Sequence, residues 1–383
     1  MDFELTEEQQ MLRDTARRFC DKEIAPHARE WDRVEAMDRD IVSALADVGF
    51  LGAAIPEEYG GMGLDTVSYS MIIEELGRAD SSVRGVVSVN VGLVGKTILK
   101  WGTEEQKREW LPRLSSGDSL GCYALTEPGS GSDAGSLQTR ATKDGEDWVL
   151  NGSKMFITNG TWAGVALVFA RTGEEGPRGI TCFLVPTDEA GFSAKGIKGK
   201  LGLRSQDTGE LFFDDVRVPS ENRLGDEGRG FNVAMSALDN GRISLAAGSV
   251  GIAQGSLDAS LRYAAERKQF GNPIARYQLI QELLADTAVE TDAARLLTWR
   301  AAAKADLGEK HTIESSMAKY FASEVAVRAA NAAVQVHGGY GYIDEYPAGK
   351  YLRDARVTTL YEGTSQIQKL IIGRSLTGEN AFF

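Results

Sequence analysis

Gly164-Val-Ala-Leu-Val-Phe169 and Ile180-Thr-Cys-Phe-Leu-Val185 are β-prone runs that decide the fold class of the middle of the chain. Further short runs of this kind occupy residues 121–125, 148–150, 155–157 and 210–213, and the turn signals Asp144-Gly145, Asn151-Gly152 and Asn159-Gly160 separate them. No helical pattern intervenes. Several short strands without helices between them predict an antiparallel β-barrel or sandwich.

Helical periodicity flanks this region on both sides. Leu12, Ala16 and Phe19 form one face of an amphipathic helix near the N-terminus, and Thr6 with Gln9 fits a capping box at its start. The helical period returns after the β-prone region in long, Ala-rich segments with few breakers. The sequence therefore predicts an α+β protein with an N-terminal helical domain (1–120), a middle β-domain (121–228) and a C-terminal four-helix bundle (229–383).

Composition excludes several classes of protein. The 383 residues include 42% apolar and 25% charged side chains, as in soluble globular proteins, and the length suggests two or three domains. A net charge of −13 disfavours nucleic acid as a partner, because an acidic field repels phosphates. No apolar run approaches the roughly 18 residues of a membrane-spanning helix, and residues 1–10 lack the pattern of a secretory signal. These features predict a soluble, cytoplasmic protein without membrane contact.

Cysteine and histidine are scarce. The chain has three of each, with no CxxC or HxxxH pair, so neither a disulfide framework nor a transition-metal site is predicted. A GxSxG elbow is also absent, which disfavours a Ser–His–Asp hydrolase. Carboxylate chemistry, cofactor chemistry or pure binding remain.

A glycine-rich loop, Leu125-Thr-Glu-Pro-Gly-Ser-Gly-Ser-Asp-Ala-Gly135, follows the first predicted strand. Glycines let backbone amides approach anionic oxygens, and Thr126, Ser130 and Ser132 add side-chain donors. A long hairpin turn is the alternative interpretation. Gly135 falls one position too late for GxGxxG and no helix follows, so a doubly wound dinucleotide fold is not supported.

Two further stretches could face a flat ligand. Phe156 and Thr158 share one side of a predicted strand, which suits the edge of a heteroaromatic ring, although such a strand is most often only a strand. Residues 335–347 end a long helix in closely spaced glycines, which fits either backbone approach to a phosphate or ring, or a simple helix cap.

Glu362 is the sharpest candidate for catalysis. It stands beside Gly363, just before a helix whose start is predicted to carry a capping box from Ser365 to Gln368. A carboxylate at this place is commonly stabilised by the helix dipole. A buried carboxylate there could equally accept a proton with a raised pKa.

Taken together, these stretches resemble the acyl-CoA dehydrogenase family of flavoproteins over essentially the whole chain. The matching motifs occur in family order at residues 54–61, 124–133, 151–160, 267–271, 335–354 and 361–364. The resemblance implies an α–β–α subunit that binds FAD between its β-domain and its C-terminal bundle. It also implies a homotetramer in which neighbouring subunits complete the cofactor site.

The resemblance carries over residue by residue to the cofactor and to CoA. It implies FAD contacts from this subunit at Tyr123, Leu125, Thr126, Gly131, Ser132, Phe156, Ile157, Thr158, Thr364 and Gln366, and contacts to the FAD of another subunit at Arg267, Phe270, Gln278, Gln335, Gly338 and Gly339. It implies acyl-CoA contacts at Ser132, Asp239, Arg242, Tyr361 and Gly363. Many members carry Trp at the Phe156 position, so the smaller ring here could alter flavin redox tuning.

In this family Glu362 matches the catalytic base. It would take the pro-R α-proton while a hydride leaves the β-carbon for flavin N5, giving the trans-2-enoyl-CoA. Its backbone amide would donate to the thioester carbonyl. Some members place the base on the helix around residues 238–242 instead, and Gly241 occupies that alternative position here.

The acyl group is less sharply defined. Arg84 interrupts an apolar helix, and with Ser88 it resembles the pair that glutaryl-CoA dehydrogenases place against a distal carboxylate; residues 373–378 with Ala381-Phe382 resemble the same subfamily. An arginine that reaches solvent or pairs with a surface acid is the alternative. The primary expectation is a short-chain saturated acyl-CoA, and the second is an acyl-CoA with an acidic tail.

Electron-transferring flavoprotein is the expected electron acceptor, because oxidases of this family are commonly longer at the C-terminus. An acyl-CoA oxidase and a non-catalytic CoA-binding protein are the alternatives. Pure binding needs no isolated base such as Glu362, which disfavours the last of these.

Overall fold

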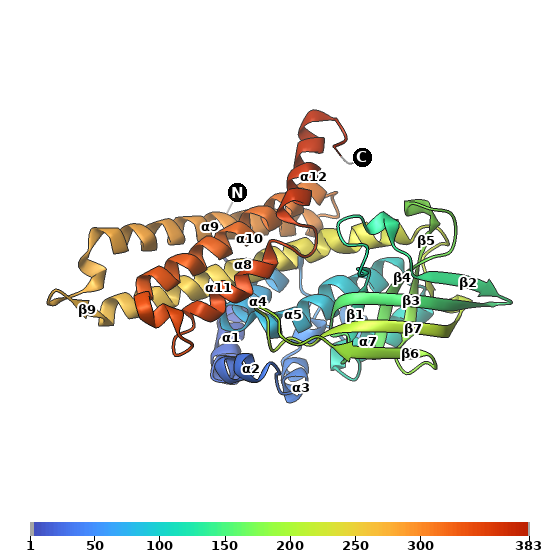
Figure 1. Cartoon of the computed structure of the whole chain (residues 1–383), viewed down its shortest axis with the longest axis horizontal. Coiled ribbons are helices and arrows are strands. Elements are labelled where there is room, and N and C mark those ends of the chain that lie inside the picture. Colours follow the sequence, from blue (N-terminus) through green and yellow to red (C-terminus); the bar gives the residue numbers. More distant parts are fainter. Residues whose placement is uncertain (1–3, 382–383) are drawn as a thin grey trace.

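The N-terminal third of the chain is helical in the computed structural model, which describes residues 4–381 (Figure 1). Phe382, part of the C-terminal resemblance, lies outside the described residues. The helices here are α1 (Glu7–Phe19), α2 (Ala28–Val34), α3 (Asp40–Asp47), α4 (Thr66–Ala79), α5 (Ser81–Val87), α6 (Lys96–Trp101) and α7 (Glu104–Ser116), with π-helical turns at Cys20–Ile24 and Ser88–Gly95.

Helix α1 begins as its sequence predicts. The Thr6 hydroxyl accepts the Gln9 N–H and the Gln9 side chain accepts the Thr6 N–H, which confirms the capping box. Ala16 is buried, and Leu12 and Phe19 pack against the same core, so the predicted apolar face is also confirmed.

The stretch Ser81–Trp101 corrects the expectation that no segment approaches membrane-spanning length. It is 21 residues long and its most apolar 18-residue window has a mean hydropathy of 1.2, enough by length and composition alone to cross a membrane. However, 83% of its most apolar window is buried inside the fold, and Val83, Val86 and Val87 are fully buried. A core helix passes the same test, because both environments exclude water.

The middle region is one eight-stranded sheet that curls on itself, built around the two long strands β3 and β7 (Figure 1). Its strands, in chain order, are β1 (Gly121–Ala124), β2 (Arg140–Asp144), β3 (Asp147–Thr158), β4 (Val165–Arg171), β5 (Ile180–Pro186), β6 (Phe192–Gly196), β7 (Thr208–Pro219) and β8 (Arg223–Leu224). The strand order is β6-β7-β3-β2-β4-β5-β8, with β1 beside β4. Most pairs are antiparallel as predicted, but β1 and β2 pair with β4 in parallel, so the purely antiparallel prediction is wrong.

Strand β4 shows why this sheet is apolar on both faces. Val165, Leu167 and Phe169 pack toward helices α7 and α8, whereas Ala166 and Val168 pack toward β3 and β7 inside the curled sheet. Side chains alternate between the two faces along a strand, so a strand covered on both sides is apolar throughout.

One predicted turn in this region is wrong. Asn151-Gly152 lies inside β3, where the pairing with β7 shifts its register. The Asn151 amide bonds the Asp215 side chain and backbone across the strands, and Gly152 has φ +146. Leu150 to Gly152 of β3 lies opposite Phe213 to Val216 of β7, so the extra residue of this bulge is in β7 and the Asn-Gly pair continues the strand instead of turning the chain. Asp144-Gly145 does join β2 to β3 as predicted.

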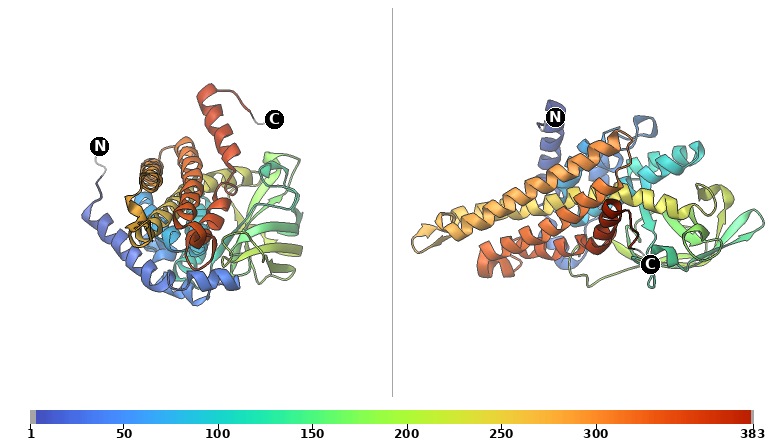
Figure 2. Two further views of the ribbon diagram at one scale, coloured as in Figure 1. Left: turned by 60° about the vertical axis from the view of Figure 1, so that its left-hand side comes forward. Right: turned by 90° about the horizontal axis from the view of Figure 1, so that it is seen from above.

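The C-terminal region contains three long helices, α8 (Gly230–Glu266), α9 (Gln278–Asp306) and α10 (Thr312–His337), followed by α11 (Ala348–Thr358) and α12 (Ser365–Thr377). The short α11 packs against α8 and α10 as the fourth member of the bundle. Figure 2 shows the long helices extending past the sheet, with the hairpin of β9 (Lys268–Gln269) and β10 (Asn272–Pro273) at the opposite end of the molecule. Helix α4 also packs on α8 and joins the N-terminal helices to the bundle.

Candidate active site

Glu362 lies in the short loop between α11 and α12, in a left-handed conformation. Its φ is +55° and that of Gly363 is +88°. Two buried side chains hold this loop: the Gln368 amide donates to the carbonyls of Glu362 and Gly363 at 3.1 and 3.0 Å, and Lys319 Nζ donates to the Gly363 carbonyl at 2.7 Å. A strained backbone that is fixed from several sides is typical of functional sites.

The predicted capping box at the start of α12 is wrong by one residue. Thr364 is the cap, and its hydroxyl accepts the Ile367 N–H at 3.2 Å. Ser365 instead donates to Glu324, and Gln368 holds the base loop. The side chain of Thr364 is thus engaged within the protein, and Gln366 is exposed on the helix.

The Glu362 carboxylate is packed against helix α8. Its Oε2 atom is buried and has no hydrogen-bond partner among residues 4–381. A Cβ placed on Gly241 would lie 2.4 Å from this oxygen, so only glycine at position 241 leaves room for the carboxylate. Burial raises the pKa of Glu362 to about 7, although the charges of Arg84, Lys319 and Arg242 oppose this increase. At neutral pH the group can therefore accept a proton.

Arg84 on α5 is buried near this carboxylate, with 2% of its surface exposed. Its Nη2 donates to the Tyr361 hydroxyl at 2.6 Å, and its Nε has no partner in the described chain. The alternative in which Arg84 reaches solvent or a surface acid is therefore wrong. Ser88 is buried one turn later and accepts from Ser244 at 2.8 Å.

Asp239 and Arg242 form a linked pair on α8. Arg242 Nη1 donates to Asp239 at 2.8 Å, and the Thr312 hydroxyl donates to the second Asp239 oxygen at 2.6 Å. Arg242 Nε approaches the Glu362 carbonyl at 3.4 Å. The pair therefore lies beside the base loop, and Asp239 fixes the orientation of the guanidinium.

The glycine-rich loop after β1 is anchored from beneath by a buried ion pair. Lys154 is fully buried, and its Nζ donates to Glu127 at 2.7 Å and to the carbonyls of Leu125 and Phe169. Glu127 in turn accepts the backbone N–H groups of residues 138 and 139. The predicted FAD contacts in β1 and this loop differ in exposure. Leu125 is buried, Tyr123 and Thr126 are half-buried, and Gly131 and Ser132 are exposed.

Phe156 and Thr158 end strand β3 at a second bulge, where one extra residue enters β3 relative to β7. Phe156 has φ +62° and leaves 66% of its surface exposed, and Thr158 accepts a hydrogen bond from Gln206 at 3.0 Å. Ile157 points the other way into the core, so its backbone alone can face a ligand.

The remaining predicted contacts lie at the far end of the bundle, away from Glu362 (Figure 1). They share exposure to solvent in this subunit: Arg267, Phe270, Gln278, Gln335, Gly338 and Gly339. Phe270 is 92% exposed, and the Arg267 guanidinium lies over the Tyr340 ring at 5.6 Å. The structure therefore divides the predicted residues into two groups, one around Glu362 and β3 and one at the end of the bundle.

Sequence reasoning missed Lys319, Gln368 and Gln206. Lys319 carried a usable signal, since a lysine within the apolar run from Met317 to Phe321 is as unusual as Arg84 in α5. Gln368 and Gln206 carried no distinct signal, because their partners are far away or depend on the loop conformation.

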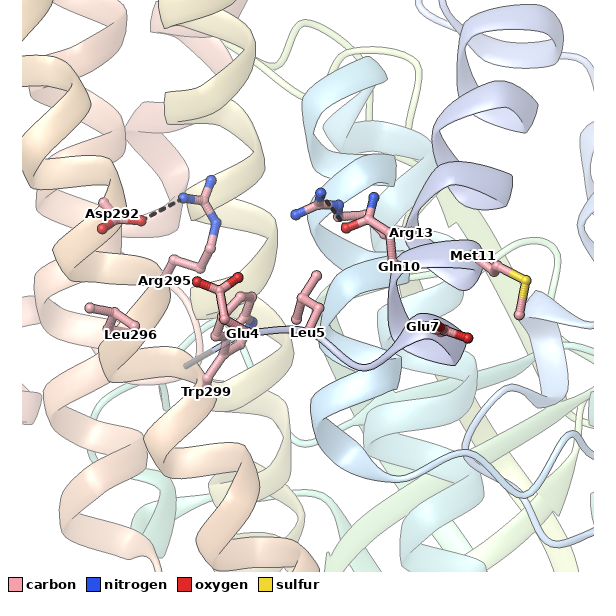
Figure 3. A pocket seen from close by; sticks show the side chains of 10 residues that line it. All are labelled: Glu4, Leu5, Glu7, Gln10, Met11, Arg13, Asp292, Arg295, Leu296 and Trp299. Carbon is pink, nitrogen blue, oxygen red and sulfur yellow. Dashed lines mark hydrogen bonds and ion pairs between the residues drawn. The ribbon is translucent and has the colours of Figure 1, made fainter. Parts of the chain in front are cut away.

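Two large cavities lie elsewhere, and none of the predicted site residues lines either of them. One of about 850 Å³ opens between the N-terminal segment with α1 and the α9 residues Asp292, Arg295, Leu296 and Trp299 (Figure 3). The other, of about 940 Å³, is lined by paired charges of α1, α2 and residues 342–353. Within residues 4–381 no group of three His, Cys, Asp or Glu side chains is placed to hold a metal ion.

Comparison with known proteins decides the family. Models of the N-terminal, middle and C-terminal domains of acyl-CoA dehydrogenases match residues 6–118, 122–216 and 228–377. The chain belongs to the acyl-CoA dehydrogenase family. It is 46% identical over 374 residues to the mitochondrial short-chain specific acyl-CoA dehydrogenase of Mus musculus, covering 97% of this chain and 91% of the relative.

Solved structures agree with this assignment. Butyryl-CoA dehydrogenase from Megasphaera elsdenii is 42% identical, with a TM-score of 0.96 over 98% of this chain and 100% of that one. A chain solved in work on the electron transferring flavoprotein of Acidaminococcus fermentans is 44% identical, with a TM-score of 0.97 over 99% and 100%. The predicted α+β architecture of this acyl-CoA dehydrogenase is thereby confirmed.

FAD is the cofactor of this dehydrogenase, and the residues present suit it. Phe156 offers an exposed ring held in a left-handed backbone conformation, which a flat ligand would cover. A Cβ on Gly129 or Gly131 would meet nothing within 4 Å, so the backbone of the glycine-rich loop is open. Gln206 Oε1, beside Thr158, is buried without a partner in the described chain.

Proposed function

We propose that this dehydrogenase oxidises a short-chain saturated acyl-CoA to the trans-2-enoyl-CoA, with Glu362 as the catalytic base. The observation that carries the proposal is the Glu362 carboxylate, which is buried against Gly241, has no hydrogen-bond partner at Oε2 among the described residues, and has a pKa raised to about 7. The similarity to short-chain specific and butyryl-CoA dehydrogenases supports the chain length.

Glu362 would take the α-proton onto its carboxylate. An α-proton beside a thioester is weakly acidic, so the base gains from desolvation and the carbonyl oxygen needs donors. The Glu362 N–H donates to no group within the described residues and is therefore free to bind that oxygen. Bound FAD supplies the acceptor for the β-hydride.

Arg242 and Asp239 supply charge and hydrogen-bonding groups beside the loop, where CoA would enter. Tyr361 and Gly363 flank the base and would border the thioester. Ser132 lies exposed on the glycine-rich loop and is available to the CoA side. Thr126, Phe156 and Thr158 would face the flavin ring, with Gln366 and the Thr364 backbone on the side of its phosphates or adenosine.

A homotetramer completes the cofactor site in this proposal. Arg267, Phe270 and Gln278 are exposed and lie at or beside the β9–β10 hairpin, which is at the end of the bundle opposite the sheet (Figure 2). A second copy of this chain would bring them, with Gln335, Gly338 and Gly339, to its neighbour's FAD.

Electron-transferring flavoprotein is the proposed acceptor. The similarity to a chain solved in work on the electron transferring flavoprotein of Acidaminococcus fermentans supports this choice. Slow reoxidation of substrate-reduced flavin in air would agree with a protein acceptor. Fast turnover with peroxide release would favour an oxidase, and a colourless protein unable to take up FAD would favour a non-catalytic CoA-binding role.

An acyl-CoA with an acidic tail is the second candidate, and Arg84 is the observation that favours it. The guanidinium is buried and bonded to a phenol rather than to a carboxylate, and its Nε has no partner in the part of the chain that the structure describes. A buried arginine without a counter-ion is costly, and a substrate carboxylate would satisfy it.

One experiment separates the two substrates. Anaerobic flavin reduction is measured with a panel of acyl-CoA thioesters from C4 to C16, including glutaryl-CoA. The short-chain proposal predicts fastest reduction by butyryl-CoA, and it predicts that Arg84→Ala changes the rates with butyryl-CoA and glutaryl-CoA by a similar factor. If glutaryl-CoA is faster and Arg84→Ala slows it far more than butyryl-CoA, the acidic substrate is correct. No reduction by any thioester would refute both.

A further inference from the structure

Lys319, in the first third of α10, contacts the loop that carries Glu362. It is fully buried, and its single hydrogen bond within residues 4–381 runs from Nζ to the Gly363 carbonyl at 2.7 Å. No carboxylate of the described chain lies within ion-pair distance of it. A buried ammonium with one neutral partner is expensive in free energy, so packing alone does not account for this residue.

The loop that Lys319 contacts needs external support. Two consecutive residues, Glu362 and Gly363, adopt left-handed backbone conformations, and for a residue with a Cβ this costs about 1 kcal/mol. Gln368 donates to both carbonyls of the loop, and Lys319 binds the second of them from the bundle side. The direction of the Glu362 amide and carboxylate depends on these bonds.

We propose that Lys319 is a positioning residue for the catalytic base. Its ammonium fixes the Gly363 carbonyl, and with it the orientation of Glu362, while its charge favours the ionised carboxylate in a site from which water is excluded. This inference rests on the proposed role of Glu362 as the base.

The electrostatic surroundings agree with this geometry. Burial lowers the pKa of Lys319 to about 8, and the nearby carboxylates of Glu362 and Glu324 oppose this decrease, whereas Arg242 adds to it. Two other cations lie near Glu362: Arg84 donates to the Tyr361 hydroxyl, and Arg242 pairs with Asp239 and reaches the Glu362 carbonyl. The groups that face Glu362 from all packed elements are Arg84, Lys319 and Arg242, with the phenols of Tyr69, Tyr123 and Tyr361.

The test compares Lys319→Met with Lys319→Gln in the FAD-loaded enzyme, by anaerobic flavin reduction from about pH 5.5 to pH 9. Loss of the ammonium should raise the pKa of Glu362, so the acid limb should move to higher pH by about one unit, a tenfold lower rate near pH 6. Lys319→Met should also reduce the rate at the high-pH plateau. Lys319→Gln should lose less there, because its amide can still donate to Gly363.

Lys369→Met is the matched control, since Lys369 is exposed on α12 and does not touch the base loop. It should leave the pH profile unchanged. A uniform loss of rate in Lys319→Met, with its acid limb at the wild-type pH, would overturn the proposal. So would loss of folding or of FAD in both Lys319 variants, because that result assigns the lysine a structural role.

Different results would refute the proposed dehydrogenase function and the proposed role of Lys319. If no acyl-CoA reduces the wild-type flavin, the proposed function is wrong. If butyryl-CoA reduces the wild-type enzyme and Lys319→Met keeps the wild-type acid limb, only the role of Lys319 is wrong.

Discussion

Replacing Gly241 by alanine tests how closely the Glu362 carboxylate is packed on α8. The added Cβ would lie 2.4 Å from Glu362 Oε2 and 2.6 Å from Leu93 Cδ2. Ordinary contact needs more than 3 Å, so the carboxylate has to move by about 1 Å. A displacement of that size at a reacting group costs roughly 100-fold in rate, or about 2.7 kcal/mol in activation free energy.

Stability should change far less than the rate. Alanine in a helix interior is favoured over glycine by about 0.5–1 kcal/mol, which offsets part of the crowding against Leu93. We therefore expect Gly241→Ala to keep FAD and its melting temperature while anaerobic flavin reduction by butyryl-CoA slows about 100-fold. Gly373→Ala on α12 is the control, because a Cβ there would meet nothing within 4 Å.

The result that would refute this reasoning is a Gly241→Ala enzyme that reduces its flavin within about threefold of the wild-type rate. The carboxylate would then not rest against α8 in the reacting enzyme. A variant that loses FAD altogether would instead place Gly241 in the structural support of the subunit.

Three further predictions follow from the same geometry. Because burial raises the pKa of Glu362 to about 7 and the base must be ionised, kcat/KM should fall about tenfold per unit as the pH drops below about 7; an acid limb near the ordinary glutamate value would contradict its burial. Lys154→Met leaves Glu127 buried without its cation, so denaturant unfolding should show a loss of about 3 kcal/mol together with weaker FAD retention, whereas the exposed Lys143→Met should change neither; equal unfolding midpoints would contradict the anchoring role. Phe270→Ala should lower FAD retention and the oligomeric mass measured by light scattering, since this ring is 92% exposed in one subunit; an unchanged mass and FAD content would argue against a contact with another copy.

The sequence predicted the elements whose apolar pattern is strong. Strands β4 and β5 are buried on both faces and read as continuous apolar runs, and the amphipathic face of α1 is also clear. Strands β2 and β6 were missed, because their residues, Arg140–Asp144 and Phe192–Gly196, are mostly polar and exposed at one face. Local pattern cannot identify a strand that is held mainly by pairing with its neighbours.

The predicted turn at Asn151-Gly152 and the predicted cap at Ser365 are wrong because these side chains form hydrogen bonds with residues distant in sequence. Asn151-Gly152 has the composition of a tight turn, yet Asn151 bonds Asp215 across the sheet, and the pair continues β3 opposite a bulge in β7. Ser365 has the composition of a cap, but Glu324 takes its hydroxyl and Thr364 caps the helix. In both cases the competing partner is distant in sequence.

In the active site too, residues within local motifs could be predicted, whereas residues whose role depends on tertiary contacts could not. Glu362 and Phe156 belong to compact motifs and could be found by resemblance. The burial of Arg84 could not be predicted, because its environment is built from α5 and the loop before α12, which are far apart in the chain. Lys319 and Gln368 act on a loop conformation that becomes visible only when the backbone is known.

The most direct test of the central claim is Glu362→Gln, which keeps the shape of the side chain and removes its ability to take a proton. The variant is loaded with FAD and titrated with butyryl-CoA without oxygen, while binding is followed by the spectral shift of the flavin. We predict normal FAD content and thioester binding with loss of flavin bleaching. Bleaching at the wild-type rate would show that another group removes the proton.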